Sequence, residues 1–154
     1  MKLCPIGYEL YSAREEAAKD LDSVLSRLSA LGYKGVEFAG FHGHSAKEIK
    51  HMLKKHDLAA LASHVPVADI EKDMDAVIDY HKAIGCKYIA VPYLDEQSRP
   101  GTPRFAEILR LIYRFGRKCR KAGLRLLYHN HDFEFVELSG MTALDFIYTA
   151  IPEN

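Results

Sequence analysis

Short apolar segments alternate with amphipathic helical segments five times along this chain, and this alternation restricts the folds open to it. The apolar segments expected as strands are residues 3–10, 33–40, 58–64, 87–93 and 124–131. Between them, apolar residues recur at the spacing of helices that bury one face. A regular strand–helix order predicts a parallel sheet covered by helices, with right-handed crossovers. Because no linker divides residues 1–154, we expect a single α/β domain.

Sequence signals at the helix ends support the same order. A serine or threonine with an acidic residue three positions later is typical of a helix start, because the two residues satisfy free backbone N–H groups. Such pairs are Ser12 with Glu15, Ser45 with Glu48, and Thr142 with Asp145. Thr102 followed by Pro103 indicates another start, since proline suits the first helical position. Apolar residues at helical spacing over residues 69–84 predict one uninterrupted helix.

Composition narrows the functional classes. The 21 lysine and arginine residues balance 21 aspartate and glutamate residues, which argues against a general nucleic-acid or anionic-membrane surface. No apolar run reaches the roughly 18 residues needed to cross a bilayer, and the N-terminus lacks a signal-peptide pattern. Cys4, Cys86 and Cys119 form no C-x-x-C pair, so we expect reduced thiols in a cytoplasmic protein.

The segment Tyr-His-Asn-His-Asp-Phe-Glu-Phe, residues 128–135, carries the strongest functional signal. In a strand, side chains two residues apart face the same way, so His129 and His131 should point together at the end of the fifth strand. Imidazole and carboxylate groups suit a divalent cation of borderline softness, and they also suit proton transfer at sugar carbons. The alternative is that one of these histidines is a hydrogen-bonded partner in a polar loop.

Polar residues gather where the expected strands end. Those at or near the C-terminal ends are Glu9, Glu37, His64, Tyr93, His129 and His131. Both α/β barrels and open α/β sheets build their sites at this edge. Glu37 lies between Val36 and Phe38 and would cost several kcal/mol if it were buried without a partner. It therefore belongs to a site, or it forms an ion pair with arginine or lysine in the core.

Several segments resemble the sugar phosphate isomerase/epimerase family. They are residues 9–12, 32–40 (GYKGVEFAG), 63–65, 87–93 and 128–135 (YHNHDFEF). The family belongs to the xylose isomerase-like TIM barrels, which also include inosose dehydratases and an endonuclease of DNA repair. The resemblance covers essentially the whole chain and is specific to the family, though not to one substrate.

The resemblance implies a (β/α)₈ barrel that holds Mn²⁺, Mg²⁺, Co²⁺ or Zn²⁺. His129 matches the position of a metal ligand at the end of the fifth strand, where many relatives have glutamate. His131 would be a second ligand or a substrate contact, and Glu37 and His64 would hold substrate hydroxyl groups. Tyr93, at the end of the fourth strand, is expected as a further substrate contact. No residue of this chain is assigned as the catalytic one.

The chain departs from the family in length. It ends at Asn154, where a sixth strand would begin, whereas a full barrel has about 250 residues. Five of the eight strands leave an incomplete barrel with open edges, so we expect either a missing C-terminal half or self-association.

Two functions follow from these patterns. The first is a metal-dependent isomerase or epimerase that acts on a sugar, sugar phosphate or polyol through an enediolate-type proton transfer, and that need not be active as this chain alone. The alternative is a non-catalytic half-barrel that binds a small polyol or associates with a second half-barrel. The nuclease branch of the family is a third option, but the chain has no basic excess.

Overall fold

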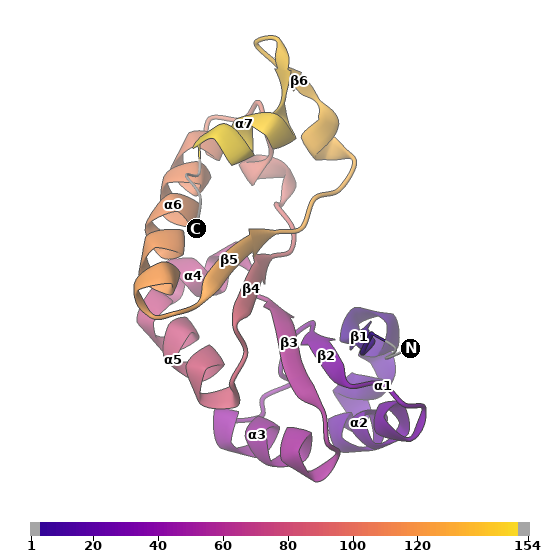
Figure 1. The fold of residues 1–154 in the computed structure, drawn as a ribbon. Helices are drawn as coiled ribbons and strands as arrows, with labels where there is room; N and C mark the ends of the chain where they lie inside the picture. Colours follow the sequence, from indigo (N-terminus) through magenta and orange to yellow (C-terminus); the bar gives the residue numbers. More distant parts are fainter. Residues whose placement is uncertain (1–3, 151–154) are drawn as a thin grey trace. The chain divides into compact units, whose positions relative to one another are not determined.

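The computed structural model describes residues 4–150, in which five strands alternate with helices. The strands are β1 (Gly7–Glu9), β2 (Gly35–Phe38), β3 (Ala59–His64), β4 (Tyr88–Val91) and β5 (Arg125–Tyr128). They follow one another in chain order in a single sheet, β1-β2-β3-β4-β5, which does not close on itself (Figure 1). The predicted parallel α/β architecture of an incomplete barrel is therefore confirmed.

The chain divides into two compact units. The first comprises Met1–His64 and Asp79–Ile89, and the second comprises Val65–Ile78 and Ala90–Asn154. The helix α5 (Met74–Ile84) and the strand β4 each contribute to both units.

The first unit contains three parallel strands and the helices between them (Figure 1). These helices are the 3₁₀ helix η1 (Leu10–Ala13), α1 (Arg14–Lys19), α2 (Leu21–Ala30) and α3 (Ala46–Lys55). The start of α3 is the predicted one: the Ser45 N–H donates to Glu48 Oε2 at 2.8 Å, and the Glu48 N–H donates to Ser45 Oγ at 3.3 Å. Apolar residues of α2, β2 and α3 share one buried cluster, which includes Leu25, Phe38 and Ile49.

The second unit is organised around the 17-residue helix α6 (Phe105–Lys121). Ile108, Ile112, Phe115 and Cys119 recur at helical spacing on its buried face. The other elements of this unit are α4 (Val67–Lys72), the 3₁₀ helices η2 (Glu96–Ser98) and η3 (Phe133–Phe135), the antiparallel pair β6 (Glu137–Leu138) and β7 (Met141–Thr142), and α7 (Ala143–Ala150). Thr142 caps α7 as predicted, because its Oγ1 accepts from the Asp145 N–H at 3.1 Å.

Two predicted helix starts are wrong. Ser12 lies inside η1, and α1 begins after Ala13, which makes no side-chain cap hydrogen bond. Thr102 does not cap α6 either: its hydroxyl donates to the Gln97 and Arg99 carbonyl groups, and the helix begins only at Phe105. At Thr102 the hydroxyl is thus used by a local turn instead of the helix.

The uninterrupted helix predicted over residues 69–84 is also wrong. The chain leaves the helix at Asp73, which has an extended backbone, and α5 begins at Met74. The Asp73 carboxylate accepts from the Asp75 and Ala76 N–H groups, both at 3.0 Å, and so acts as the N-cap of α5. Among the helices of residues 4–150, none combines the length and apolar character that crossing a membrane requires.

Each unit has a strand with an exposed apolar side chain. In the first unit, Leu61 of β3 is 42 % exposed, and its side chain lies over the backbone of Gly7 and Gly35. In the second unit, Leu127 of β5 is equally exposed. This exposure agrees with the expected incomplete barrel.

Candidate metal centre

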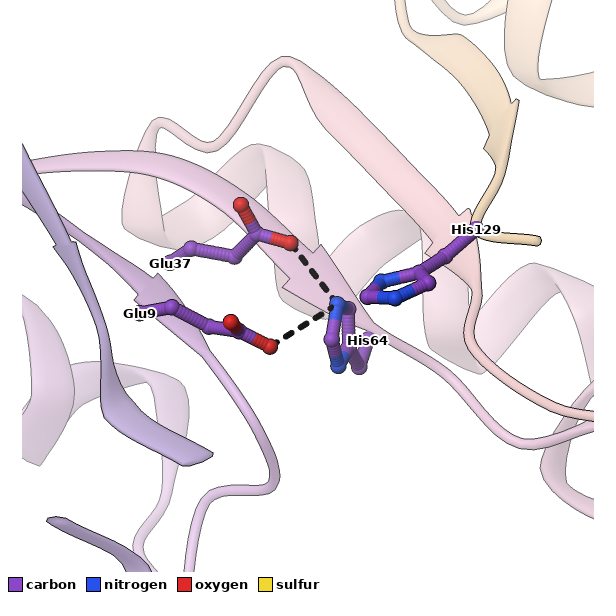
Figure 2. A group of neighbouring side chains, drawn as sticks. All are labelled: Glu9, Glu37, His64 and His129. Carbon is purple, nitrogen blue, oxygen red and sulfur yellow. Dashed lines mark ion pairs between the residues drawn. The ribbon is translucent and has the colours of Figure 1, made fainter. Parts of the chain in front are cut away.

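Two carboxylates and an imidazole meet where three neighbouring strands of the first unit end. Glu9 is the last residue of β1, Glu37 lies in β2, and His64 is the last residue of β3. His64 Nε2 lies 2.7 Å from Glu37 Oε1 and 3.8 Å from Glu9 Oε1. Dashed lines mark both ion pairs in Figure 2. These three residues are called the Glu–Glu–His cluster below.

The backbone pairing explains why these three side chains meet. Glu9 of β1 is the register partner of Glu37 in β2, so their side chains leave the sheet on the same side. Glu37 in turn pairs with Ala62, beyond a register shift that follows Val36, and His64 lies two residues after Ala62 on the same face of β3. The cluster is therefore fixed by parallel strands and not by flexible loops.

Alternation along β2 sets the environment of Glu37. Val36 and Phe38 are fully buried in the core, so the intervening Glu37 points to the opposite side. Its side chain is 33 % exposed, and no lysine or arginine of residues 4–150 forms an ion pair with it. Its ion-pair partner is His64 instead. The alternative of an ion pair with arginine or lysine in the core is therefore wrong for the described residues.

The donor set of the cluster fits a divalent metal. One potential ligand atom from each of Glu9, Glu37 and His64 lies within 4.8 Å of the others. The His64 side chain is only 9 % exposed, whereas that of Glu9 is 39 % exposed, so the group is shielded on one side and open on the other. Carboxylate oxygen and imidazole nitrogen together suit Mn²⁺, Co²⁺ or Zn²⁺. A cation would also relieve the repulsion between two neighbouring carboxylates.

The two histidines of the 128–135 segment lie in the second unit, in the loop after β5. The fifth strand ends at Tyr128, three residues earlier than expected. The His129 N–H donates to the Val91 carbonyl oxygen at 3.0 Å. The His129 and His131 rings stack with 5.1 Å between centroids and 18° between planes, so they point the same way as predicted, although neither lies in the strand.

A buried carboxylate holds this loop in place. Glu134 is fully buried and accepts two hydrogen bonds, one from the Tyr128 hydroxyl at 2.5 Å and one from the His131 N–H at 2.6 Å. Burial, together with the Glu134 carboxylate, raises the pKa of Tyr128 well above its usual value. The hydroxyl therefore stays protonated and remains a donor to Glu134 at any physiological pH.

Tyr93 follows β4 and contacts His131 within the second unit. Its side chain is 47 % exposed, and its ring meets the His131 ring edge-on with 5.2 Å between centroids. The structure thus brings the predicted site residues together in two groups. The first group is Glu37 with His64, and the second is Tyr93 with His131 and His129. The sequence placed Glu9 at a strand end but did not assign it to the site, and it gave no sign of the role of Glu134.

No protein-family model matches the chain, and no curated protein matches it. Solved structures do match. A sugar phosphate isomerase/epimerase from Parabacteroides distasonis aligns over 96 % of this chain and 61 % of its own, with 21 % identity and a TM-score of 0.76. An AP endonuclease of family 2 from Brucella melitensis aligns over 81 % of this chain and 55 % of its own, with 18 % identity and a TM-score of 0.65. An IOLI protein with a binding zinc atom aligns over 81 % of this chain and 51 % of its own, with 13 % identity and a TM-score of 0.61.

These likenesses define the class of fold. The chain has the fold of sugar phosphate isomerase/epimerase and xylose isomerase-like barrel proteins, which confirms the predicted resemblance in structural terms. It spans 61 % and 55 % of the length of the first two relatives.

Proposed function

We propose that this chain forms part of a metal-dependent isomerase or epimerase that acts on a sugar, sugar phosphate or polyol through an enediolate-type proton transfer. The observation that carries the proposal is the Glu–Glu–His cluster at the ends of three adjacent parallel strands. Functional sites in α/β barrels are built at this edge. Among proteins of the same fold, one is named a sugar phosphate isomerase/epimerase and another carries a zinc atom. Both observations support the proposal of a metal-dependent isomerase or epimerase.

Glu9, Glu37 and His64 would hold the metal. We propose His129, which follows β5, as a further metal ligand, because its imidazole nitrogen suits the same cations. A bound divalent cation would polarise the substrate carbonyl and hydroxyl oxygens and stabilise the negative charge that develops when a proton leaves the neighbouring carbon.

The remaining site residues would bind and orient the substrate. The ion pair of 2.7 Å between His64 and Glu37 holds the His64 ring in one orientation, which presets the cluster for a ligand. We propose Tyr93 and His131 as substrate contacts, because the exposed Tyr93 hydroxyl can exchange hydrogen bonds with sugar hydroxyl groups. Glu37 and His64 would contact substrate hydroxyl groups wherever they are not occupied by the metal.

Calorimetric titration of Mn²⁺ into the metal-stripped full chain tests the metal centre. We expect binding at micromolar strength, and we expect Glu37→Gln and His64→Ala each to weaken it at least about tenfold, because each removes a ligand. Asp22→Asn is the matched control, since Asp22 is an acidic residue of the same unit whose partners are Lys55 and His56. Absence of Mn²⁺ binding, or equal binding by all variants, would refute the metal centre.

His129→Ala separates the fourth ligand from the rest. If this variant binds Mn²⁺ as tightly as the wild type while His64→Ala does not, the assignment of His129 is wrong and the cluster stands alone.

Proton transfer is tested on the metal-loaded chain with a panel of ketoses, aldoses and polyols in deuterated water. We expect deuterium to enter the substrate carbon next to the carbonyl group, which NMR detects even where the equilibrium position does not change. Metal binding without any deuterium incorporation would contradict catalysis by this chain and favour a half-barrel that only binds its ligand.

A further inference from the structure

A guanidinium group is held against two aromatic rings in the second unit. Arg99, in the loop after β4, places its Cζ 4.2 Å from the ring centroid of Phe133 and 5.3 Å from that of Tyr93. Its Nε–H donates to the Leu94 carbonyl oxygen at 3.2 Å, and one of its terminal N–H groups donates to the Tyr93 hydroxyl. Four contacts thus fix the position of a charged group that is usually mobile.

Within residues 4–150, no carboxylate forms an ion pair with this cation, whereas Arg104 a few residues later is paired with Glu71 at 3.0 Å. Asp95 lies in the same loop, and its carboxylate accepts from the Ser98 N–H at 2.9 Å. A half-buried guanidinium that is fixed but lacks an anionic partner is preorganised to bind one.

The donors around Arg99 have the right character for an anion. A guanidinium has five N–H groups, of which one is used on Leu94 and one on Tyr93, and the others make no further hydrogen bond within the described residues. Because the Tyr93 hydroxyl oxygen accepts from Arg99, its own proton is free to donate to a ligand. Tyr93 is kept in place by edge-on contacts with His131 and with Phe133, at centroid distances of 5.2 and 5.6 Å.

These donors lie at the kind of place where parallel sheets bind ligands. Tyr93 and Arg99 follow β4, and His131 follows β5, so the group lies after the C-terminal ends of two adjacent strands. Ligands of parallel α/β sheets bind at this edge.

We propose that Arg99 and Tyr93 form a subsite for an anionic group of the substrate, either a phosphoryl group or a carboxylate, and that Arg99 determines specificity for it. The inference rests on the proposed function in taking the anion as part of the substrate. It narrows the substrate class, because a neutral sugar or polyol would leave these donors without a partner of opposite charge.

Direct binding tests the subsite with three probes that share one carbon skeleton. Glycerol phosphate, glycerate and glycerol are titrated calorimetrically into the full chain, loaded with Mn²⁺ where it binds. We expect at least one of the two anions to bind and glycerol not to bind measurably. If glycerol phosphate alone binds, the subsite takes a phosphoryl group. If glycerate binds about as tightly as glycerol phosphate, the subsite takes a carboxylate. Failure of both anions to bind overturns the inference.

Substitutions show whether Arg99 is responsible. Arg99→Gln should weaken anion binding at least about tenfold, because hydrogen bonds to charged groups are lost. Arg99→Lys should retain part of the affinity, since it keeps the charge without the planar fork. Arg104→Gln is the matched control, with an arginine of the same unit whose charge is already paired. Equal losses in Arg99→Gln and Arg104→Gln would show a general charge effect and overturn the inference, as would unchanged binding in Arg99→Gln.

Two further measurements keep the outcomes distinct. Circular dichroism establishes whether Arg99→Gln is folded. If it is not, Arg99→Lys is titrated with the same probes. Weaker anion binding than in the wild type then shows that the guanidinium fork binds the anion, and unchanged binding shows that it does not. Mn²⁺ titration of the same variants separates the two proposals. Normal Mn²⁺ binding without anion binding refutes only the subsite, whereas anion binding that depends on Arg99 without Mn²⁺ binding refutes only the metal-dependent function.

Discussion

The buried carboxylate of Glu134 should be the polar group whose removal most destabilises the loop after β5. It is fully buried and accepts from both the Tyr128 hydroxyl and the His131 N–H. Glu134→Ala removes both hydrogen bonds at once and leaves two donors inside the protein without an acceptor. The loop that carries His129 and His131 would then lose the group that sets its conformation.

The size of the effect follows from the two orphaned donors. A buried donor left without a partner costs about 1–3 kcal/mol, and the lost methylene group adds about 1 kcal/mol. With two such donors, we expect Glu134→Ala to lower the free energy of unfolding by about 3–7 kcal/mol, a large part of the roughly 5–15 kcal/mol typical of a domain. Glu134→Gln keeps the shape and one acceptor oxygen, so it should lower the free energy of unfolding by only about 1–2 kcal/mol.

Urea unfolding followed by circular dichroism measures these differences. A double-mutant cycle with Tyr128→Phe isolates the bond of 2.5 Å between Tyr128 and Glu134, and the two changes should not be additive. Glu137→Ala is the control, because Glu137 is an exposed glutamate of the same segment, and it should change the free energy of unfolding by no more than about 0.5 kcal/mol. If Glu134→Ala behaves like Glu137→Ala, the carboxylate does not organise the loop.

Three further predictions concern residues outside the sites. Gly35→Ala should lower the free energy of unfolding by about 1–3 kcal/mol in urea, because a Cβ there would lie 2.6 Å from Leu61 Cγ and 2.8 Å from a backbone oxygen; a Leu61→Ala background should relieve only part of this loss. Burial raises the pKa of Cys86 to about 11 and that of Cys119 to about 12, so neither thiol should react with a disulfide reagent at neutral pH until urea unfolds the protein. Burial also raises the pKa of Tyr80 from 10.0 to about 12, so the stability that Tyr80 contributes is complete below pH 10 and declines as the pH rises toward 12. Urea unfolding at these pH values should show a shallower decline in Tyr80→Phe, and equal slopes would contradict the shift.

The short apolar runs of the sequence are sufficient to locate the five strands, because each strand carries its own burial signal. Helix boundaries were less accessible. The apolar period runs through Asp73 without a break, since a residue that caps a helix looks in sequence like one on its exposed face. Ser12 and Thr102 both look like caps in the sequence, yet Ser12 lies within a 3₁₀ turn and the Thr102 hydroxyl donates to nearby backbone carbonyl groups, and neither outcome has a sequence signal of its own.

The sequence predicts those parts of the candidate site that follow from the alternation of side chains along a strand. Glu37 opposes two buried neighbours, and His64 ends the next strand, so both could be identified from the sequence alone. The contact between them could not, because it depends on the register between β2 and β3 and on the shift after Val36. Arg99 and Glu134 were missed for a related reason: their partners are brought to them by 3₁₀ turns and loops, which leave no periodic signal.

The position of Glu37 is best understood as a compromise between stability and binding. Its neighbours Val36 and Phe38 are both fully buried, and a charged side chain between them gains little from the hydrophobic core. The ion pair with His64 offsets part of this cost, but Glu9 lies on the same side of the sheet and adds a second negative charge close by. Neighbouring carboxylates repel each other unless one is protonated or a cation lies between them. Since β1, β2 and β3 fix all three side chains before any ligand arrives, the repulsion is built into the folded state. A divalent cation between the carboxylates would turn this repulsion into attraction, and this supports the proposal of a metal at the cluster over that of a purely structural ion pair.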